Sequence, residues 1–351
     1  MRGGNVIESI GLLCDSCGGK VGGQTTRNKE LIKYFSKRNI QVNVCDTCGL
    51  GRRKYFFLYR KINRFCRYNP KIIIVQNRYS KGYMWPLLKN MQHVYHNQFF
   101  EMVVGGVEAQ YLLKYPRVIR AYKVIKRVYT ETFLLTEQFQ QIGIGNVVRM
   151  PTCIPVMPYK GAEIGFNFEQ PLPICMLSRV CKEKGIETAM KAVRIANQII
   201  GRQAYHLNIF GPIEDGYESE FEHWLNEYRQ EVSYQGFLEE EKKTEKLHQH
   251  YLFLFPTEHK GEGFPAMLID VFAAGLPVIC SDINALPEIV EHGRLGFVVH
   301  RPYAEQVAGY LEEAYHNPEK IYEMRKEALK EAGKYDIDVV WQQLWSDIME
   351  V

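Results

Sequence analysis

Short runs of apolar residues alternate along this chain with segments of helical periodicity. In the first half, apolar runs at Ile10–Leu13, Val42–Val44 and Lys71–Val75 predict buried strands. In the second half, the predicted strands are Ile174–Leu177, Leu207–Phe210, Leu252–Phe255, Val278–Cys280 and Phe297–Val299. Strands that alternate with helices are typical of parallel sheets built from βαβ units. The pattern therefore predicts an α/β protein with two doubly wound domains.

Five prolines between Pro151 and Pro173, with little periodic hydrophobicity, predict a linker between the two domains. We expect a first domain over residues 1–160 and a second over 161–335. Residues 336–351 are predicted to form an amphipathic helix with an aromatic stripe that packs back on the first domain.

Charge changes sign at the same linker. Residues 1–160 hold 26 Lys and Arg against 8 Asp and Glu, whereas residues 161–351 hold 18 against 32. Two halves of opposite charge favour two domains with different partners. No run approaches the roughly 18 consecutive apolar residues of a membrane-spanning helix, and Glu8 interrupts the N-terminal stretch where a secretory signal is apolar. With an odd number of cysteines, nine, this predicts a cytoplasmic protein with reduced thiols.

The segment GEGFPAMLIDVFAAGLP, residues 261–277, carries the most informative chemistry. It directly follows a predicted strand, and ligands of parallel sheets bind beyond the carboxyl ends of strands. Glu262 and Asp270 are eight residues apart, so both can face one ligand on the loop and the helix that follows. Carboxylates accept hydrogen bonds from hydroxyl pairs, which makes a sugar and a ribose natural ligands. The loop Gly263–Ala266 can offer backbone N–H groups to an anion.

A second segment, LSRVCKEKG at residues 177–185, places two cations after another predicted strand. Arg179 ends the strand and Lys184 opens the next helix. Two cations at such a position are suited to a diphosphate.

Taken together, these segments resemble the retaining glycosyltransferases of family four, which have the GT-B fold of two Rossmann-like domains facing across a cleft. The resemblance extends over GGQTTRN, CMLSRVCKEKGIETAMKA, LNIFGPIEDGYESEFE, VSYQGFL and the segment from Phe255 to Val299. It implies an N-terminal acceptor-binding domain and a C-terminal nucleotide-sugar domain.

The resemblance also implies a role for individual residues. The donor sugar falls to Glu262, the diphosphate to Arg179 and Lys184, and the ribose to Asp270, where the family usually has glutamate. His96 corresponds to a histidine that lies close to the transferred sugar in the family. Donor contacts are further implied for Gly22, Gly23, Gly211, Gly263, Phe264, Pro265 and Ala266. No bound metal is implied, and the leaving phosphate is expected to accept the acceptor's proton.

Two CxxC pairs, Cys14/Cys17 and Cys45/Cys48, allow zinc as an alternative, because they could supply four thiolates. The 27 residues between the pairs include a predicted helix, unlike a compact zinc ribbon. We therefore favour thiols without a metal.

The predicted function is transfer of a hexose from a UDP- or GDP-linked donor to a glycan or lipid-linked acceptor in surface polysaccharide biosynthesis. A nucleotide-sugar epimerase of the same fold and a non-catalytic polyanion-binding protein remain as alternatives. Cations interleaved with aromatic residues at 51–71 and 114–129 suit an anionic membrane surface, and nucleic acid is not expected. We predict peripheral, salt-sensitive binding to the inner face of the membrane, chiefly through Arg52, Arg53, Lys54, Arg60 and Lys61.

Overall fold

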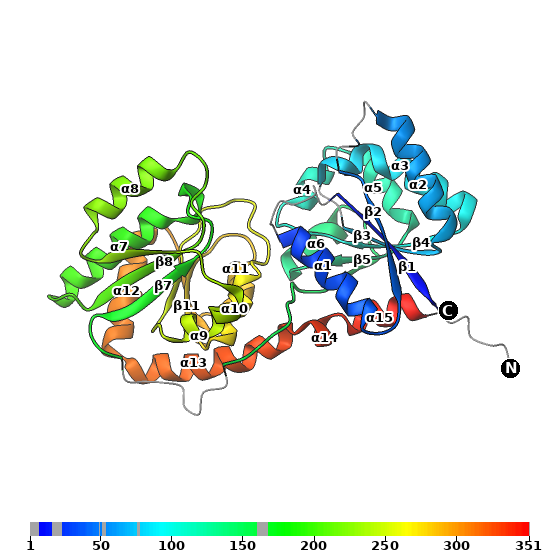
Figure 1. The fold of residues 1–351 in the computed structure, drawn as a ribbon. Coiled ribbons are helices and arrows are strands. Elements are labelled where there is room, and N and C mark those ends of the chain that lie inside the picture. Colours follow the sequence, from blue (N-terminus) through cyan, green and yellow to red (C-terminus); the bar gives the residue numbers. More distant parts are fainter. Residues whose placement is uncertain are drawn as a thin grey trace. The chain divides into compact units, whose positions relative to one another are not determined.

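Two parallel sheets form the framework of the two units into which the chain divides (Figure 1). The computed structural model describes residues 7–15, 23–48, 50, 54–75, 78–159 and 168–350. Unit 1 comprises Met1–Pro151 and Val340–Val351, and unit 2 comprises Thr152–Val339. Each sheet has six parallel strands, which confirms the predicted α/β fold.

Unit 1 has the strand order β2-β1-β3-β4-β5-β6. Its strands are β1 (Ser9–Cys14), β2 (Gln41–Asp46), β3 (Lys71–Val75), β4 (Gln98–Met102), β5 (Ile125–Thr130) and β6 (Val147–Arg149). Its helices are α1 (Gly23–Ser36), α2 (Tyr55–Tyr68), α3 (Arg78–Tyr95), α4 (Glu108–Leu112), α5 (Pro116–Ala121), the 3₁₀ turn η2 (Tyr122–Val124) and α6 (Phe133–Gln141). The isoleucines of β3 are fully buried, which explains why this strand has the predicted bounds.

The end of the chain completes unit 1. Helix α14 (Ile337–Val340) leads into α15 (Gln342–Met349). The Trp341 ring packs edge-to-face on Tyr34 of α1, with 5.1 Å between ring centroids. Asp347 accepts a hydrogen bond from the Tyr129 hydroxyl at 2.6 Å in the interior of the unit. The aromatic stripe of this segment is therefore a packing surface, and the last residues are an integral part of unit 1.

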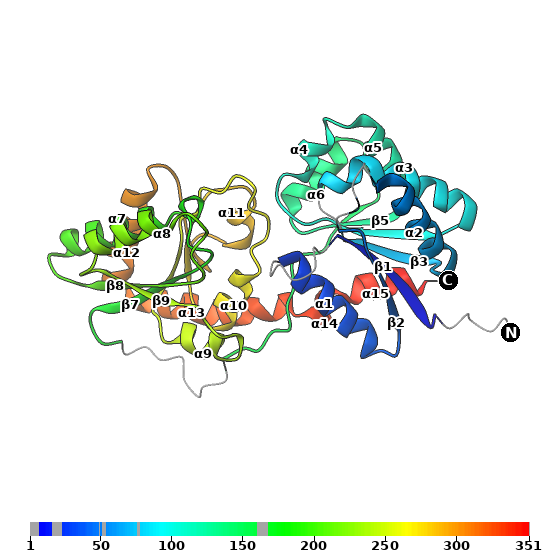
Figure 2. The ribbon, with the colours of Figure 1, turned by 45° about the horizontal axis from the view of Figure 1, so that its top comes forward.

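Unit 2 has the strand order β12-β11-β10-β7-β8-β9, of which Figure 2 labels β7, β8 and β9. Its strands are β7 (Leu172–Leu177), β8 (Tyr205–Phe210), β9 (Val232–Gly236), β10 (Phe253–Phe255), β11 (Val278–Ser281) and β12 (Gly296–Val299). Its helices are η3 (Lys182–Lys184), α7 (Ile186–Ile200), α8 (Glu218–Glu227), η4 (Glu240–Lys242), α9 (Lys243–His248), α10 (Met267–Ala273), α11 (Leu286–Ile289), α12 (Tyr303–His316), α13 (Pro318–Ala332) and η5 (Gly333–Tyr335).

Alternate residues along the strands of unit 2 bury opposite faces of the sheet. Ile174 and Met176 of β7 join the apolar cluster formed by α7 and α12. Cys175, between them, joins the cluster that contains α10. Burial of both faces explains why these strands appear in the sequence as continuous apolar runs.

The boundary between the units differs from the predicted one, lying at Pro151/Thr152 instead of 160/161. Segment 152–159 belongs to unit 2, because its backbone forms hydrogen bonds with residues of that unit. Ile154 pairs with Asp336, and the Val156 amide donates to the Asp336 carboxylate at 3.0 Å. The C-terminal boundary likewise lies at Val339/Val340, four residues after the predicted one.

Candidate functional site

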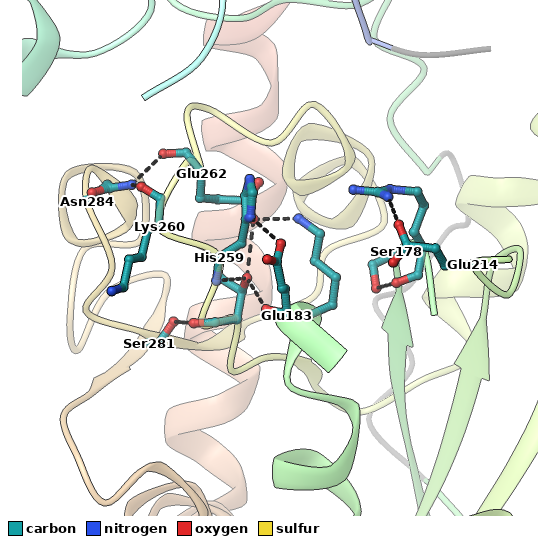
Figure 3. A network of polar contacts seen from close by, with 11 residues as sticks. Ser178, Glu183, Glu214, His259, Lys260, Glu262, Ser281 and Asn284 are labelled. Atoms are coloured by element: carbon teal, nitrogen blue, oxygen red, sulfur yellow. Dashed lines mark hydrogen bonds and ion pairs between the residues drawn. The ribbon is translucent and has the colours of Figure 1, made fainter. Parts of the chain in front are cut away.

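Three neighbouring strands of unit 2 bring the predicted site residues to one edge of the sheet. β10 lies between β7 and β11, and all three are parallel, so the segments that follow them start at the same edge. β7 leads to Arg179 and Lys184, and β10 leads to Glu262. Figure 3 shows these segments meeting at the carboxyl ends of the strands.

Glu262 and Lys184 form a nearly buried ion pair. The Lys184 Nζ lies 2.5 Å from Glu262 Oε2, and the two side chains are 13% and 10% exposed. The Thr257 hydroxyl donates to the same oxygen at 3.3 Å. The structure thus joins two residues that the sequence placed on separate motifs, and it adds Thr257, which the sequence analysis missed.

Residues in the segments that follow β7 and β11 form hydrogen bonds with the loop that carries Glu262. Asn284, which adopts a left-handed backbone with φ of 49°, donates from Nδ2 to the carbonyls of Lys260 (2.8 Å) and Glu262 (3.0 Å). His259 Nδ1 lies 2.6 Å from a Glu183 carboxylate oxygen. Figure 3 shows these contacts on both sides of the loop. Glu262 is therefore fixed through its backbone as well as its side chain.

Two glycines allow the chain segments of the site to approach closely. Gly185, at φ +74°, follows Lys184, and a Cβ there would lie 2.0 Å from the Pro256 carbonyl oxygen. Gly211, at φ +126°, lies against the backbone of Ser178, where a Cβ would meet the carbonyl oxygen at 1.8 Å. Only glycine fits either position. The structure gives Gly211 this packing role beside the segment that carries Arg179.

Arg179 lies apart from the Lys184–Glu262 pair. Its guanidinium forms an ion pair with Glu214, and both side chains are about half exposed. The two predicted diphosphate ligands therefore each contact a different carboxylate in this structure.

Asp270 lies one helix turn into α10 and pairs with Lys243 of α9. The Lys243 Nζ lies 2.9 Å from Asp270 Oδ2. Burial raises the pKa of Asp270 to about 6, although the neighbouring Lys243 charge acts in the opposite direction. The sequence analysis missed Lys243, because a lysine in a run of charged residues gives no signal of a buried partner.

Residues 264–266 form the entry to α10. Phe264 is buried, with its ring edge-to-face on Tyr335, and its carbonyl accepts a hydrogen bond from Thr152 at 3.2 Å. The carbonyls of Pro265 and Ala266 accept from the first helical amides. Within the described parts of the chain, the backbone N–H groups of Gly263, Phe264 and Ala266 contact no acceptor. These groups are available to an anion, and the anion-binding role expected of this loop stays a prediction.

Of the predicted site residues of unit 1, the structure describes Gly23 and His96, which lie at opposite edges of the sheet. Gly22 lies outside the described residues, and Gly23 is the first residue of α1. His96 is exposed and left-handed, with φ of 56°, and lies between α3 and β4. It is therefore at the amino edge of the sheet, opposite the edge at which ligands of parallel sheets bind. This position gives no support to the role implied for His96.

An ion pair that the sequence did not reveal lies at the carboxyl edge of the unit 1 sheet. Arg27 of α1 contacts Glu131, which follows β5, and both side chains are largely buried. The other oxygen of Glu131 accepts a hydrogen bond from the Gly105 amide at 3.3 Å. Since 104 residues separate the two partners, only the fold could reveal the pair.

Among the described residues, no group of three or more His, Cys, Asp or Glu side chains could hold a metal ion. Cys14 and Cys45 are buried thiols that are not part of a disulfide, and burial raises the pKa of Cys45 to about 11. Cys48, in contrast, is disulfide-bonded, so the expectation of reduced thiols fails at this residue. Cys17 lies outside the described residues. None of the helices in the described residues has the length and the apolar content that a membrane span requires.

Comparison with known proteins finds a family model that matches most of unit 2. Residues 163–333 match the family model of the glycosyl transferases group 1. The chain is 29% identical over 146 residues to the amylovoran biosynthesis glycosyltransferase AmsK of Erwinia amylovora. It is 27% identical over 149 residues to the putative colanic acid biosynthesis glycosyltransferase WcaL of Salmonella typhimurium. These matches cover 40% and 41% of this chain but only 35% and 36% of the relatives' own lengths.

Solved structures with the same fold cover nearly the whole chain. HepE from Anabaena, solved in complex with UDP, has a TM-score of 0.73 at 13% identity over 96% of this chain and 98% of its own. Sucrose-phosphate synthase from Thermosynechococcus elongatus has a TM-score of 0.72 at 16% identity over 97% and 98%. At this level of identity the likeness shows the fold alone. It confirms the predicted GT-B fold.

Proposed function

We propose that this protein is a retaining glycosyltransferase, because residues 163–333 match the family model of the glycosyl transferases group 1. It moves a hexose from a nucleoside diphosphate sugar to a glycan or lipid-linked acceptor. The observation that carries the proposal is the contact between Lys184 and Glu262 at the carboxyl edge of the sheet. It supports a site in which a cation for the diphosphate lies beside a carboxylate for the sugar hydroxyls.

The proposed reaction separates charge at the bond between the sugar and the diphosphate. As the bond from the anomeric carbon to the phosphate oxygen breaks, negative charge grows on the diphosphate. Lys184 and the free N–H groups of the loop 263–266 stabilise that charge. Arg179 contributes after leaving Glu214, an exchange that is easy between half-exposed side chains. The acceptor oxygen then bonds to the anomeric carbon on the same face, and its proton passes to the leaving phosphate.

Glu262 and Asp270 hold the two ends of the donor in this proposal. Glu262 accepts hydrogen bonds from the sugar hydroxyls, and Asp270 accepts them from the ribose. We propose a UDP- or GDP-linked donor, and UDP in the HepE complex supports the first. The names of AmsK and WcaL support polysaccharide biosynthesis as the setting and favour sugar transfer over epimerisation or polyanion binding.

Product analysis with and without an acceptor tests the function. The protein is incubated with UDP- and GDP-sugars, alone and with lipid-linked or oligosaccharide acceptors. We expect a new glycosidic product of retained anomeric configuration only when an acceptor is present. Conversion of the donor sugar to an epimer without an acceptor would instead support the epimerase. Absence of both reactions and of nucleotide binding would refute a donor site.

Substitution of Glu262 tests the site itself. Glu262→Gln keeps the size of the side chain but removes the charge, so turnover should fall at least ~100-fold while nucleotide affinity changes little. The matched control is Glu258→Gln in the same loop, where the carboxylate pairs with Arg301 on the surface. Wild-type turnover in the Glu262 variant would remove the site assignment.

We also propose that unit 1 binds an anionic membrane surface through the outer face of α2. One side of α2 is buried through Leu58, Ile62 and Cys66. The opposite side exposes aromatic rings and cations, and the helix contains no acidic residue. The exposed side chains are Tyr55, Phe56, Phe57, Tyr59, Arg60, Lys61, Arg64, Arg67 and Tyr68.

Charge and aromatic character together favour lipid as the occupant of this face. Phe56 and Phe57 are 64% and 66% exposed, an arrangement that is costly in water but favourable at a bilayer interface. Each cation near an anionic surface contributes about 1 kcal/mol. Of the residues named from the sequence, Lys54, Arg60 and Lys61 are exposed, whereas Arg52 and Arg53 lie outside the described residues.

Vesicle co-sedimentation tests this surface. We expect binding to phosphatidylglycerol-containing vesicles at low salt, weaker binding at high salt, and little binding to neutral vesicles. Arg60→Glu/Arg64→Glu should weaken binding by at least ~30-fold. Lys330→Glu on exposed α13 serves as the control. Equal binding to both lipids, or wild-type binding by the double variant, would refute the proposal.

A further inference from the structure

The pair Lys243–Asp270 stands at the point where α9 packs on α10. Lys243 is the first residue of α9, and its Nζ lies between Asp270 Oδ2 (2.9 Å) and Glu240 Oε1 (2.7 Å). The side chains of Lys243 and Asp270 are only 14% and 15% exposed, whereas Glu240 is 76% exposed. Asp270 thus depends on one nearly buried cation.

Only one oxygen of the Asp270 carboxylate is used in this pair. Over the described ranges of the chain, no donor contacts Oδ1. A nearly buried carboxylate with an unused oxygen has the capacity to accept a hydrogen bond from a ligand. That capacity is greatest when the carboxylate is ionised.

The surroundings of Asp270 make ionisation depend on Lys243. From η4, Glu240 faces it with a like charge, and Lys243 is the nearest cation. α13 contributes the apolar Ala328 and Ala332 to the same cluster as α10. Two further titratable groups near this helix pair are directed elsewhere: His248 Nδ1 contacts the Ala274 carbonyl, and Arg325 donates to carbonyls of residues 248, 250 and 251.

We infer that Lys243 is a positioning residue of the nucleotide subsite, which holds Asp270 ionised and leaves its second oxygen to a hydroxyl of the nucleotide. This inference rests on the proposed function, because it takes Asp270 as the ribose ligand. In this inference Lys243 acts through Asp270 and does not itself contact nucleotide or sugar.

A characteristic pH dependence follows from this arrangement. Burial already raises the pKa of Asp270 to about 6, so nucleotide binding should weaken as the pH falls through that value. Removing the Lys243 charge favours the neutral carboxyl and moves this loss to higher pH. The effect of the substitution should therefore be large at neutral pH and small in alkali, which a purely structural role would not produce.

Calorimetric titration of the full-length protein with UDP and with GDP, from pH 5 to 9, tests the inference. At pH 7 we expect Lys243→Met to bind about tenfold more weakly than wild type, with the difference fading at pH 9. Lys243→Arg should restore affinity to within about threefold, since it keeps the charge. Lys242→Met is the matched control, because this adjacent lysine is 72% exposed and pairs with Glu239. Weakening by Lys243→Met that is equal at all pH values, or absent, overturns the inference.

A ligand-free measurement keeps this test separate from that of the proposed function. Carboxyl-carbon NMR should show the titration midpoint of Asp270 moving upward by at least ~1 pH unit in Lys243→Met. An unchanged midpoint overturns the inference even if nucleotide binds. A wild-type protein that binds neither UDP nor GDP contradicts the proposed function and removes the nucleotide from the role of Lys243.

Discussion

Replacing Lys184 by methionine should destabilise unit 2, because it leaves the Glu262 carboxylate nearly buried without its cation. Removing one partner of a buried ion pair typically costs about 3–5 kcal/mol. The lower end applies here, since Thr257 still donates to the same oxygen and the carboxylate keeps 10% exposure. We therefore expect the free energy of unfolding of unit 2 to fall by about 3 kcal/mol.

Substitution of Glu262, alone and together with Lys184, shows how much of the lost stability comes from the ion pair itself. Glu262→Gln should cost about 2 kcal/mol, because Lys184 retains the Phe255 ring, whose centroid lies 5.5 Å from Nζ. The double variant Lys184→Met/Glu262→Gln buries no unpaired charge, so it should cost about 2 kcal/mol, less than Lys184→Met alone and far less than the sum of the two. The expected coupling energy is about 3 kcal/mol.

Hydrogen exchange followed by mass spectrometry measures these energies within one molecule. Amides of β7 and β10 lie in the core of unit 2 and exchange through its global opening. Amides of β3, in unit 1, provide an internal control that should not change. Single substitutions whose costs add within about 0.5 kcal/mol would refute the reasoning, since independent sites behave in that way.

Three further predictions follow from the site. Gly185→Ala should destabilise unit 2 by more than about 3 kcal/mol, because it adds a clash with Pro256 to an unfavourable φ; Gly201→Ala, with a similar φ and open space, should cost about 1 kcal/mol in the same denaturation experiment. Asp270→Asn should weaken UDP binding at least tenfold in calorimetry while lowering turnover of bound donor much less, and the reverse pattern would contradict its role at the ribose. Transfer should continue in EDTA, because in the proposed reaction Lys184 and Arg179 supply the positive charge at the diphosphate; loss of activity that magnesium or manganese restores would contradict this.

The fold could be predicted from the sequence because its strands are buried on both faces. All eight predicted strands are present, and β3 has the predicted bounds. β4, β5, β6 and β9 were missed, since their apolar residues are interrupted by polar or charged ones, such as Lys126 and Arg127 of β5. The apolar pattern detects strands whose apolar residues are nearly continuous in sequence; β4 is buried but contains Glu101, and it was missed.

The site could be predicted only in part, because sequence motifs do not show which edge of a sheet a residue occupies. Glu262 and Lys184 each follow a predicted strand, so a parallel sheet brings them to one edge. His96 precedes its strand, and this order, which depends on where β4 starts, puts it at the other edge. Lys243 and Asn284 act through contacts with distant residues, which no local pattern encodes.

Unit 1 is built from two separate segments of the chain, and this affects how it can fold during synthesis. Ribosomes add about 5–20 residues per second, and domains generally fold from the N-terminus as they emerge. Here the ribosome must synthesise residues 152–339 before Trp341 and the rest of segment 340–351 can pack on residues 1–151 of unit 1. At that pace, unit 1 waits roughly 10–40 seconds with the face of α1 that carries Tyr34 uncovered. Unit 2, which is continuous in sequence, can be complete before the unit that precedes it on the chain.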